Sequence, residues 1–135
     1  MAYQIKDSGI NWHPKQGDIL ICDFRGNMAP EIVKKRPVVV VTPRHVHRIG
    51  LCMVVPLSST PPERFDPYVV ELSRNYASDD AKRQFAKCDL VCSVNWKRLD
   101  RIKTGYRRYE TRKMDAHDFK AVMEGLAFAF GMKTS

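Results

Sequence analysis

The chain has 135 residues, enough for one domain, which excludes a multidomain machine. Lys and Arg number 23 against 15 Asp and Glu, so the formal net charge of +8 favours an anionic partner such as a nucleic acid. With 44% hydrophobic residues, the composition is that of a globular domain with a core and not that of a disordered chain.

The N-terminal residues have no apolar h-region or cleavage site of a secretory signal, and the apolar runs are far shorter than the roughly 18 residues of a membrane span. We therefore expect a cytoplasmic protein without membrane contacts. Cysteines occur at 22, 52, 88 and 92 without C-x-x-C spacing. This pattern predicts reduced, buried thiols in place of disulfides or zinc ligands.

Residues 1–16 are polar and irregular, and we expect an N-terminal extension there, followed by one domain over 17–135. Prolines and small hydroxyl residues at 58–62 predict a loop, because proline lacks an amide donor and hydroxyls compete for backbone groups. β-Forming residues between Gly and Pro boundaries predict a series of strands at 19–24, 38–42, 51–57, 68–72 and 86–94.

The C-terminal segment changes to helical periodicity. Its apolar residues fall on one stripe and predict an amphipathic helix over about 115–130, with Asp115 as N-cap and Gly131 after its end. A shorter helical turn is expected at 96–102. Strands followed by a helix indicate a mainly β fold with a C-terminal helix, in the form of a small, strongly curved antiparallel barrel capped by that helix.

Three separated segments carry a recognisable pattern: GDILICDF at 17–24, RPVVVV at 36–41 and KCDLVCSVNWKRL at 87–99. Their order resembles the MazF/PemK (Kid) family of bacterial toxin endoribonucleases. In that family a Gly-Asp opens the first strand, an Arg-Pro opens the second, the third ends in Ser or Thr, and a Cys-Asp strand precedes a basic turn. The resemblance covers about residues 17–130.

The resemblance implies an SH3-like, partly open barrel that forms a homodimer and cleaves single-stranded RNA without a metal or cofactor. It also implies a cognate antitoxin whose disordered tail covers the RNA groove. In such cleavage the ribose 2′-hydroxyl attacks the phosphorus, leaving a cyclic phosphate and a 5′-hydroxyl. Two alternatives remain open, because the same barrel serves CcdB-like gyrase-binding toxins and would also serve a non-catalytic RNA-binding protein.

Four residues are the catalytic candidates that the resemblance implies. Arg36 matches the catalytic arginine of the Arg-Pro motif, and its charged, planar group suits a phosphate in the transition state. Ser58 matches the hydroxyl residue at the end of the third strand, although a turn would also favour serine there. Lys87 and Asp89 occupy the positions of the Arg and Asp that are the acid and base candidates of the PemK/Kid branch. Lys87 departs from that pattern, because it replaces the Arg. Strand alternation predicts that they share a face.

Other roles are open for this pair, because a carboxylate is a weak base at neutral pH. Asp89 could position the substrate, or the two residues could form a cross-strand ion pair. The chain also departs from some PemK-like members by having no His between residues 24 and 36.

Cations and hydroxyls of the predicted loops are candidates for RNA-backbone contacts: Arg25, Lys34, Lys35, Arg44, His47, Ser59 and Thr60. Trp96 beside two cations could stack a base, with core packing as the alternative. A metal site at His45 and His47 is disfavoured, because it would lack further ligands and neighbouring arginines would repel the ion. The Arg107-Arg108 pair could contact phosphate or form a solvated tip.

Overall fold

The structure is a computed structural model, and it describes residues 9–46, 48–78 and 82–132. In chain order the elements are β1 (Asp18–Asp23), β2 (Lys35–Val40), β3 (Leu51–Ser58), β4 (Val69–Glu71), β5 (Phe85–Lys87), η1 (Cys88–Leu90), β6 (Cys92–Asn95), η2 (Trp96–Arg98), β7 (Leu99–Asp100), β8 (Ile102–Gly105), β9 (Arg108–Glu110), β10 (Arg112–Lys113) and α1 (Ala116–Ala129).

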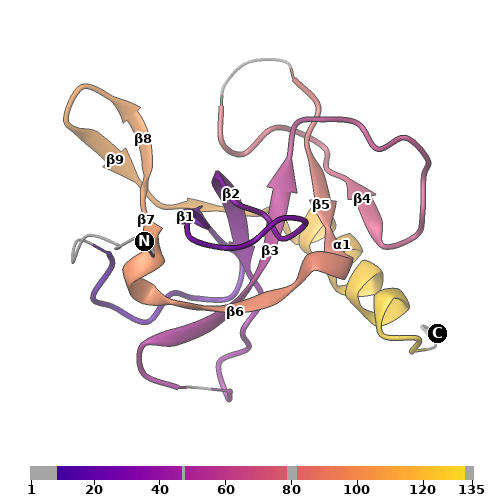
Figure 1. Ribbon diagram of the computed structural model, residues 1–135, viewed down its shortest axis with the longest axis horizontal. Coiled ribbons are helices and arrows are strands. Elements are labelled where there is room, and N and C mark those ends of the chain that lie inside the picture. Colours follow the sequence, from indigo (N-terminus) through magenta and orange to yellow (C-terminus); the bar gives the residue numbers. More distant parts are fainter. Residues whose placement is uncertain (1–8, 47, 79–81, 133–135) are drawn as a thin grey trace.

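The main sheet is eight-stranded and follows the order β10-β1-β2-β3-β5-β4, while β6 also pairs with β3 and β7 also pairs with β1. All of its pairs are antiparallel. Figure 1 shows the curved sheet with α1 packed on one side and the β8-β9 hairpin projecting from the body. The predicted mainly β fold with a C-terminal helix and a partly open barrel is therefore confirmed.

The central strands are buried on both faces, as the run of valines predicts. Val39 and Val55 belong to a core cluster that includes Val122 of α1. The alternate residues Val38 and Val54 belong to a second cluster on the opposite face, together with side chains that include Ile10, Phe24 and Leu99. Since side chains alternate between the faces of a strand, one face of the central strands packs against α1, while the other is enclosed by the curved sheet itself, with Val94 of β6 and Leu99 of β7 closing the cluster.

The predicted strand over 86–94 is wrong, because the chain is interrupted there by η1. Leu57 of β3 pairs with Ala86, and an uninterrupted strand in the same register would pair Val54 with Asp89. In the structure Val54 pairs with Cys92 instead. Three residues are therefore extra, and they form η1. Gly125 of α1 packs closely on this turn, since a Cβ at that position would lie 2.8 Å from the Cys88 Sγ atom.

The helical turn expected at 96–102 is shorter than predicted. Only Trp96–Arg98 forms a 3-10 turn, and Asn95 caps it by accepting a hydrogen bond from the Lys97 amide. Extended backbone follows, because Leu99 pairs with Cys22 of β1 and the side chain of Leu99 is buried in the second cluster.

Helix α1 confirms the predicted C-terminal helix, with one difference at its start. Asp115 occupies the N-cap position but its side chain makes no capping hydrogen bond there. Gly131 has φ +73, the left-handed conformation that commonly ends a helix. The predicted apolar stripe is only partly buried, because Val122 and Leu126 lie in the core while Phe130 is 66% exposed.

All four cysteines are free, with Cys22, Cys52 and Cys88 buried and Cys92 half-buried, in agreement with the prediction of reduced thiols. Burial raises the pKa of each of these four thiols. In the residues that the structure describes, α1 falls short of the length and apolarity that a bilayer-spanning helix needs. From the predicted N-terminal extension, Ile10 packs into the second cluster.

Candidate active site

The candidate site lies where β2, β3 and β5 run side by side. In the β2-β3 pair, Val38 lies opposite Pro56, and this register brings Arg36 level with Ser58. In the β3-β5 pair, Ser58 lies opposite Phe85, and Lys87 ends β5. The strand ladder thus brings three residues that are distant in sequence to one region of the sheet.

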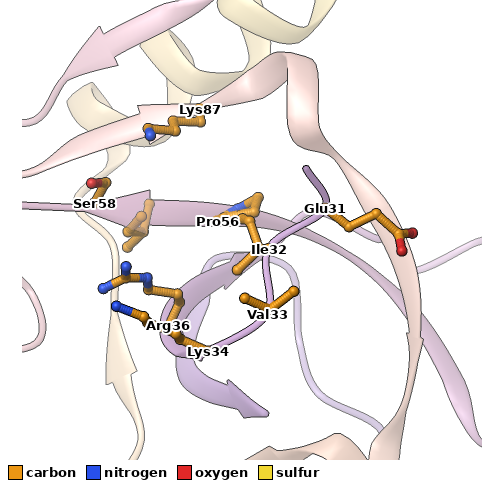
Figure 2. A pocket seen from close by; sticks show the side chains of 9 residues that line it. Glu31, Ile32, Val33, Lys34, Arg36, Pro56, Ser58 and Lys87 are labelled. Carbon is orange, nitrogen blue, oxygen red and sulfur yellow. The ribbon is translucent and has the colours of Figure 1, made fainter. Parts of the chain in front are cut away.

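A cavity of about 220 Å³ opens over this region. Figure 2 shows the head groups of Arg36, Ser58, Lys34 and Lys87 directed to the same side of it. Its lining consists of Glu31, Ile32, Val33, Lys34, Arg36, Pro56, Leu57, Ser58 and Lys87. The arrangement combines cations with a hydroxyl, which are the groups that hold a phosphate.

Arg36 is the second residue of β2 and its side chain is exposed. In the part of the chain that the structure describes, no carboxylate forms an ion pair with its guanidinium. The following proline, Pro37, lies opposite Ile21 and continues the strand. The positive charge of Arg36 is therefore available to an anionic ligand at the mouth of the cavity.

Ser58 ends β3 and is half-buried. Its Oγ atom accepts a hydrogen bond from the Thr60 amide at 3.2 Å, so the turn after the strand fixes the position of the hydroxyl. The Oγ–H can still donate, because an amide occupies only an acceptor site of a hydroxyl. Ser58 can thus donate to a phosphate oxygen while the loop holds it in place.

Lys87 and Asp89 do not share a strand face, and this expectation is wrong. Lys87 is the last residue of β5, whereas Asp89 lies in η1, where strand alternation no longer applies. Lys87 is half-buried and lines the cavity, while Asp89 is exposed and is outside its lining. The structure therefore brings together Arg36, Ser58 and Lys87 but leaves out the predicted carboxylate.

The β1-β2 loop covers one side of the cavity and is held by its own hydrogen bonds. The Asn27 side chain donates to the Ile32 carbonyl at 3.1 Å, and the Phe24 amide donates to the Lys34 carbonyl at 3.2 Å. These bonds fix the loop segment that lines the cavity.

Glu31 lines the cavity and was not among the predicted site residues. Its carboxylate accepts from the Met28 amide at 2.8 Å, and Figure 2 shows it directed away from Arg36, Ser58 and Lys87. Its place in the loop that leads into the Arg-Pro motif is the sequence signal that could have identified it.

The predicted RNA contacts fall into two groups. Lys34 lines the cavity, and Lys35, Ser59 and Thr60 are exposed neighbours of its lining residues. Arg25, Arg44 and Trp96 are outside the cavity lining.

The Arg25 guanidinium forms a two-pronged ion pair with Asp23, with distances of 2.9 and 2.8 Å. Arg44 lies in the loop before β3, at the opposite end of that strand from Ser58. His47 is outside the described residues. Trp96 packs against the second core cluster, with its ring 5.6 Å from that of His13, which fits the alternative of core packing.

Within residues 9–46, 48–78 and 82–132, no three His, Cys, Asp or Glu side chains are grouped so that they could hold a metal ion. Arg44 and His45 are both exposed in their loop.

Sequence comparison identifies the family. The profile of the PemK-like, MazF-like toxins of type II toxin-antitoxin systems matches residues 15–130, so this chain belongs to that family. The uncharacterized protein YifN of Escherichia coli (strain K12) is 34% identical, and the match covers 74% of this chain and 80% of that protein. The resemblance of the three sequence segments is therefore confirmed at the level of the family.

Solved structures share the fold. MazF from Deinococcus radiodurans superposes with a TM-score of 0.65 at 20% identity, covering 90% of this chain and 99% of that one. A mycobacterial endoribonuclease in complex with its cognate antitoxin gives a TM-score of 0.63 at 17% identity, covering 91% and 100%. At these identities the comparison establishes the same partly open barrel and helix.

Proposed function

We propose that this chain is a toxin endoribonuclease that cleaves single-stranded mRNA at selected sequences, by attack of the 2′-hydroxyl and without a metal ion. The observation that carries the proposal is the convergence of Arg36, Ser58 and Lys87, from three neighbouring strands, on one cavity. Membership of the PemK/MazF toxin family supports the same conclusion.

The proposed reaction transfers the phosphoryl group within the RNA. The ribose 2′-oxygen forms a bond to phosphorus while the bond from phosphorus to the 5′-oxygen breaks, which leaves a 2′,3′-cyclic phosphate and a 5′-hydroxyl. Arg36 binds the non-bridging oxygens, whose negative charge grows in the transition state, and Ser58 donates a hydrogen bond to the same phosphate. The ammonium of Lys87 gives a proton to the departing 5′-oxygen.

The 2′-hydroxyl proton must also find an acceptor. The only carboxylate among the cavity-lining residues of the described chain is that of Glu31, and it points away and accepts from the Met28 amide. We therefore assign the proton to solvent water that enters the open cavity. Asp89 is the alternative acceptor, since it is exposed just beyond Lys87.

We extend the proposal to the partners that are typical of the family. A structural neighbour is described as an endoribonuclease in complex with its cognate antitoxin. By analogy, an antitoxin segment covering the cavity would neutralise this chain, which would act as a homodimer. An acidic antitoxin segment would be attracted by the net charge of +8.

Analysis of the product ends tests this chemistry directly. The purified chain is incubated with RNA in EDTA, and the fragments are examined by mass spectrometry. We expect cyclic phosphates and 5′-hydroxyls, and no cutting of a matched substrate with 2′-O-methyl groups, because that substrate lacks the nucleophile. Fragments with 5′-phosphates, or equal cutting of the methylated substrate, would reject the mechanism.

A further inference from the structure

The β8-β9 hairpin is a second basic surface, separate from the cavity lining. It projects from the body of the molecule in Figure 1. Ile102 lies opposite Glu110 and Lys103 lies opposite Tyr109 in its ladder. Because opposite residues share a face, Lys103 and Tyr109 lie on one face while Ile102 and Glu110 lie on the other.

One face of the hairpin packs against the core and the other faces solvent. Ile102 is 2% exposed and belongs to the core cluster beneath α1, so its face is the inner one that anchors the hairpin. Glu110 on that face accepts from the Arg112 guanidinium at 2.8 Å, which neutralises its charge. The outer face presents Lys103 and Tyr109 to solvent. The carboxylate of Glu110 lies on the inner face, away from them.

Arginines and tyrosines are paired on the outer face and at the tip. The Arg101 guanidinium lies 5.3 Å from the ring centroid of Tyr109, and the Arg107 guanidinium lies 5.1 Å from that of Tyr106. Tyr109 is 42% exposed and Tyr106 is 80% exposed. In the described part of the chain, Arg101, Lys103 and Arg107 form no ion pair with a carboxylate.

We propose that this face binds single-stranded RNA outside the cleavage cavity, with bases stacked on Tyr106 and Tyr109 and phosphates held by Arg101, Lys103 and Arg107. Exposed rings interleaved with cations that have no carboxylate partner are the combination that binds single strands without reading their sequence. An acidic protein partner would match the charge but would not need the rings. This inference rests on the proposed function only in naming RNA as the strand.

The sheet connects the hairpin to the cavity. Cys22 of β1 is the partner of Leu99 on one side and of Arg36 on the other. Neighbouring strands lie about 4.8 Å apart, so the backbones of Leu99 and Arg36 are about 10 Å apart, and the hairpin begins just after β7. One strand of RNA could therefore contact both surfaces, within the roughly 4 to 16 nucleotides that such sites cover.

The test is carried out in an Arg36→Ala background, so that binding is measured without cleavage. Fluorescence anisotropy compares labelled oligouridylates of about 20 and about 4 nucleotides, chosen because stacking tolerates any base. Two hairpin variants separate the contributions: Tyr106→Ala with Tyr109→Ala removes the rings, and Arg101→Ala with Lys103→Ala removes charge. Lys15→Ala with Lys120→Ala is the charge-matched control, since both side chains are exposed elsewhere on the molecule.

We expect the double tyrosine-to-alanine variant to bind the longer oligonucleotide about tenfold more weakly or worse, with a smaller loss for the short one. Tyr106→Phe with Tyr109→Phe should restore the affinity, because the rings return. The Arg101/Lys103 variant should reduce the slope of log K against log salt by about 1.4, and the control should not.

Three results would overturn the inference. The double tyrosine-to-alanine variant could bind RNA as tightly as its parent, or the Lys15/Lys120 control could change the salt slope as much as the Arg101/Lys103 variant does. Polyglutamate could also bind with the same dependence on the two rings. Absence of RNA binding by the parent chain would overturn it as well. Cleavage by the wild-type chain is measured separately. If the wild-type chain does not cleave RNA but binding depends on the hairpin, the nuclease is rejected and this surface is kept. If the wild-type chain cleaves RNA but the hairpin variants bind as well as their parent, only the surface is rejected.

Discussion

The hydroxyl of Tyr76 donates a 2.6 Å hydrogen bond to the carboxylate of Asp118 in α1, and the two residues are 42 positions apart in sequence. The same carboxylate accepts from the amide and the hydroxyl of Ser73, and the Tyr76 oxygen accepts from the Asp115 amide. Asp118 is 3% exposed and Tyr76 is 1% exposed. This buried network joins the segment between β4 and β5 to the start of the helix.

Removing the Tyr76 hydroxyl should destabilise the fold. A hydrogen bond to a charged group contributes about 1.5–3 kcal/mol, and burial raises the pKa of Tyr76 to about 12, so the hydroxyl remains a donor at neutral pH. Tyr76→Phe should therefore lower the free energy of unfolding by about 1.5–3 kcal/mol in urea titrations. Tyr68→Phe is the matched control, because its hydroxyl donates to Asp66 in a hydrogen bond that is only partly buried. Equal loss in the two variants would show that the Asp118 network adds nothing.

The same network predicts a dependence of stability on pH. Burial raises the pKa of Asp118, but hydrogen bonds from Tyr76 and Ser73 outweigh it and hold the pKa below the ordinary value of 3.8. The unfolded chain therefore binds the proton more readily than the folded one. The contribution of Asp118 is complete above the unfolded pKa and is lost as pH falls below about 4 towards the folded value.

Unfolding free energies measured from neutral pH downwards test this prediction. The wild-type chain should lose stability steeply below pH of about 4, and Asp118→Asn should show a shallower fall over that range. Parallel curves for the two proteins would mean that other carboxylates account for the acid sensitivity.

Ser58 should contribute through its hydroxyl to the cleavage reaction. Loss of one hydrogen bond to a charged phosphate oxygen corresponds to about a ten- to hundredfold fall in kcat/KM for Ser58→Ala. Ser58→Thr keeps the hydroxyl and should retain most of the rate, while Ser93→Ala on the exposed part of β6 serves as control. A threonine variant as slow as the alanine variant would contradict a role for the hydroxyl itself.

Lys87 and Asp89 should differ in their effect on cleavage. Lys87 lines the cavity and Asp89 does not, so Lys87→Ala should reduce kcat by about a hundredfold, the range of a lost proton donor. Asp89→Asn should reduce kcat much less if solvent accepts the 2′-hydroxyl proton. Single-turnover rates on one RNA substrate provide the comparison, and a larger loss for Asp89→Asn would assign that proton to Asp89.

Local signals in the sequence were sufficient for much of the fold. Apolar runs between glycines and prolines placed the first three strands, and helical periodicity placed α1. The antiparallel ladder then brought Arg36 level with Ser58, as the motifs had suggested. These features depend on residues that are close in sequence or on regular pairing.

The failures have a different origin, because they depend on contacts between distant segments. The break of the predicted fifth strand follows from a change of register along β3 and from the packing of Cys88 against Gly125 of α1. No local pattern contains that information. For the same reason, nothing in the local sequence indicates that Asp89 leaves the strand or that Tyr76 contacts Asp118.

The most direct measurement is RNA cleavage in EDTA by the wild-type chain and by Arg36→Ala, followed on gels with circular dichroism to verify folding. We expect the wild-type chain to cut and the folded variant to be slower by at least about a hundredfold, because the guanidinium stabilises the charge of the transition state. RNA that stays intact at high concentration of the wild-type chain, or full activity of folded Arg36→Ala, would contradict the account.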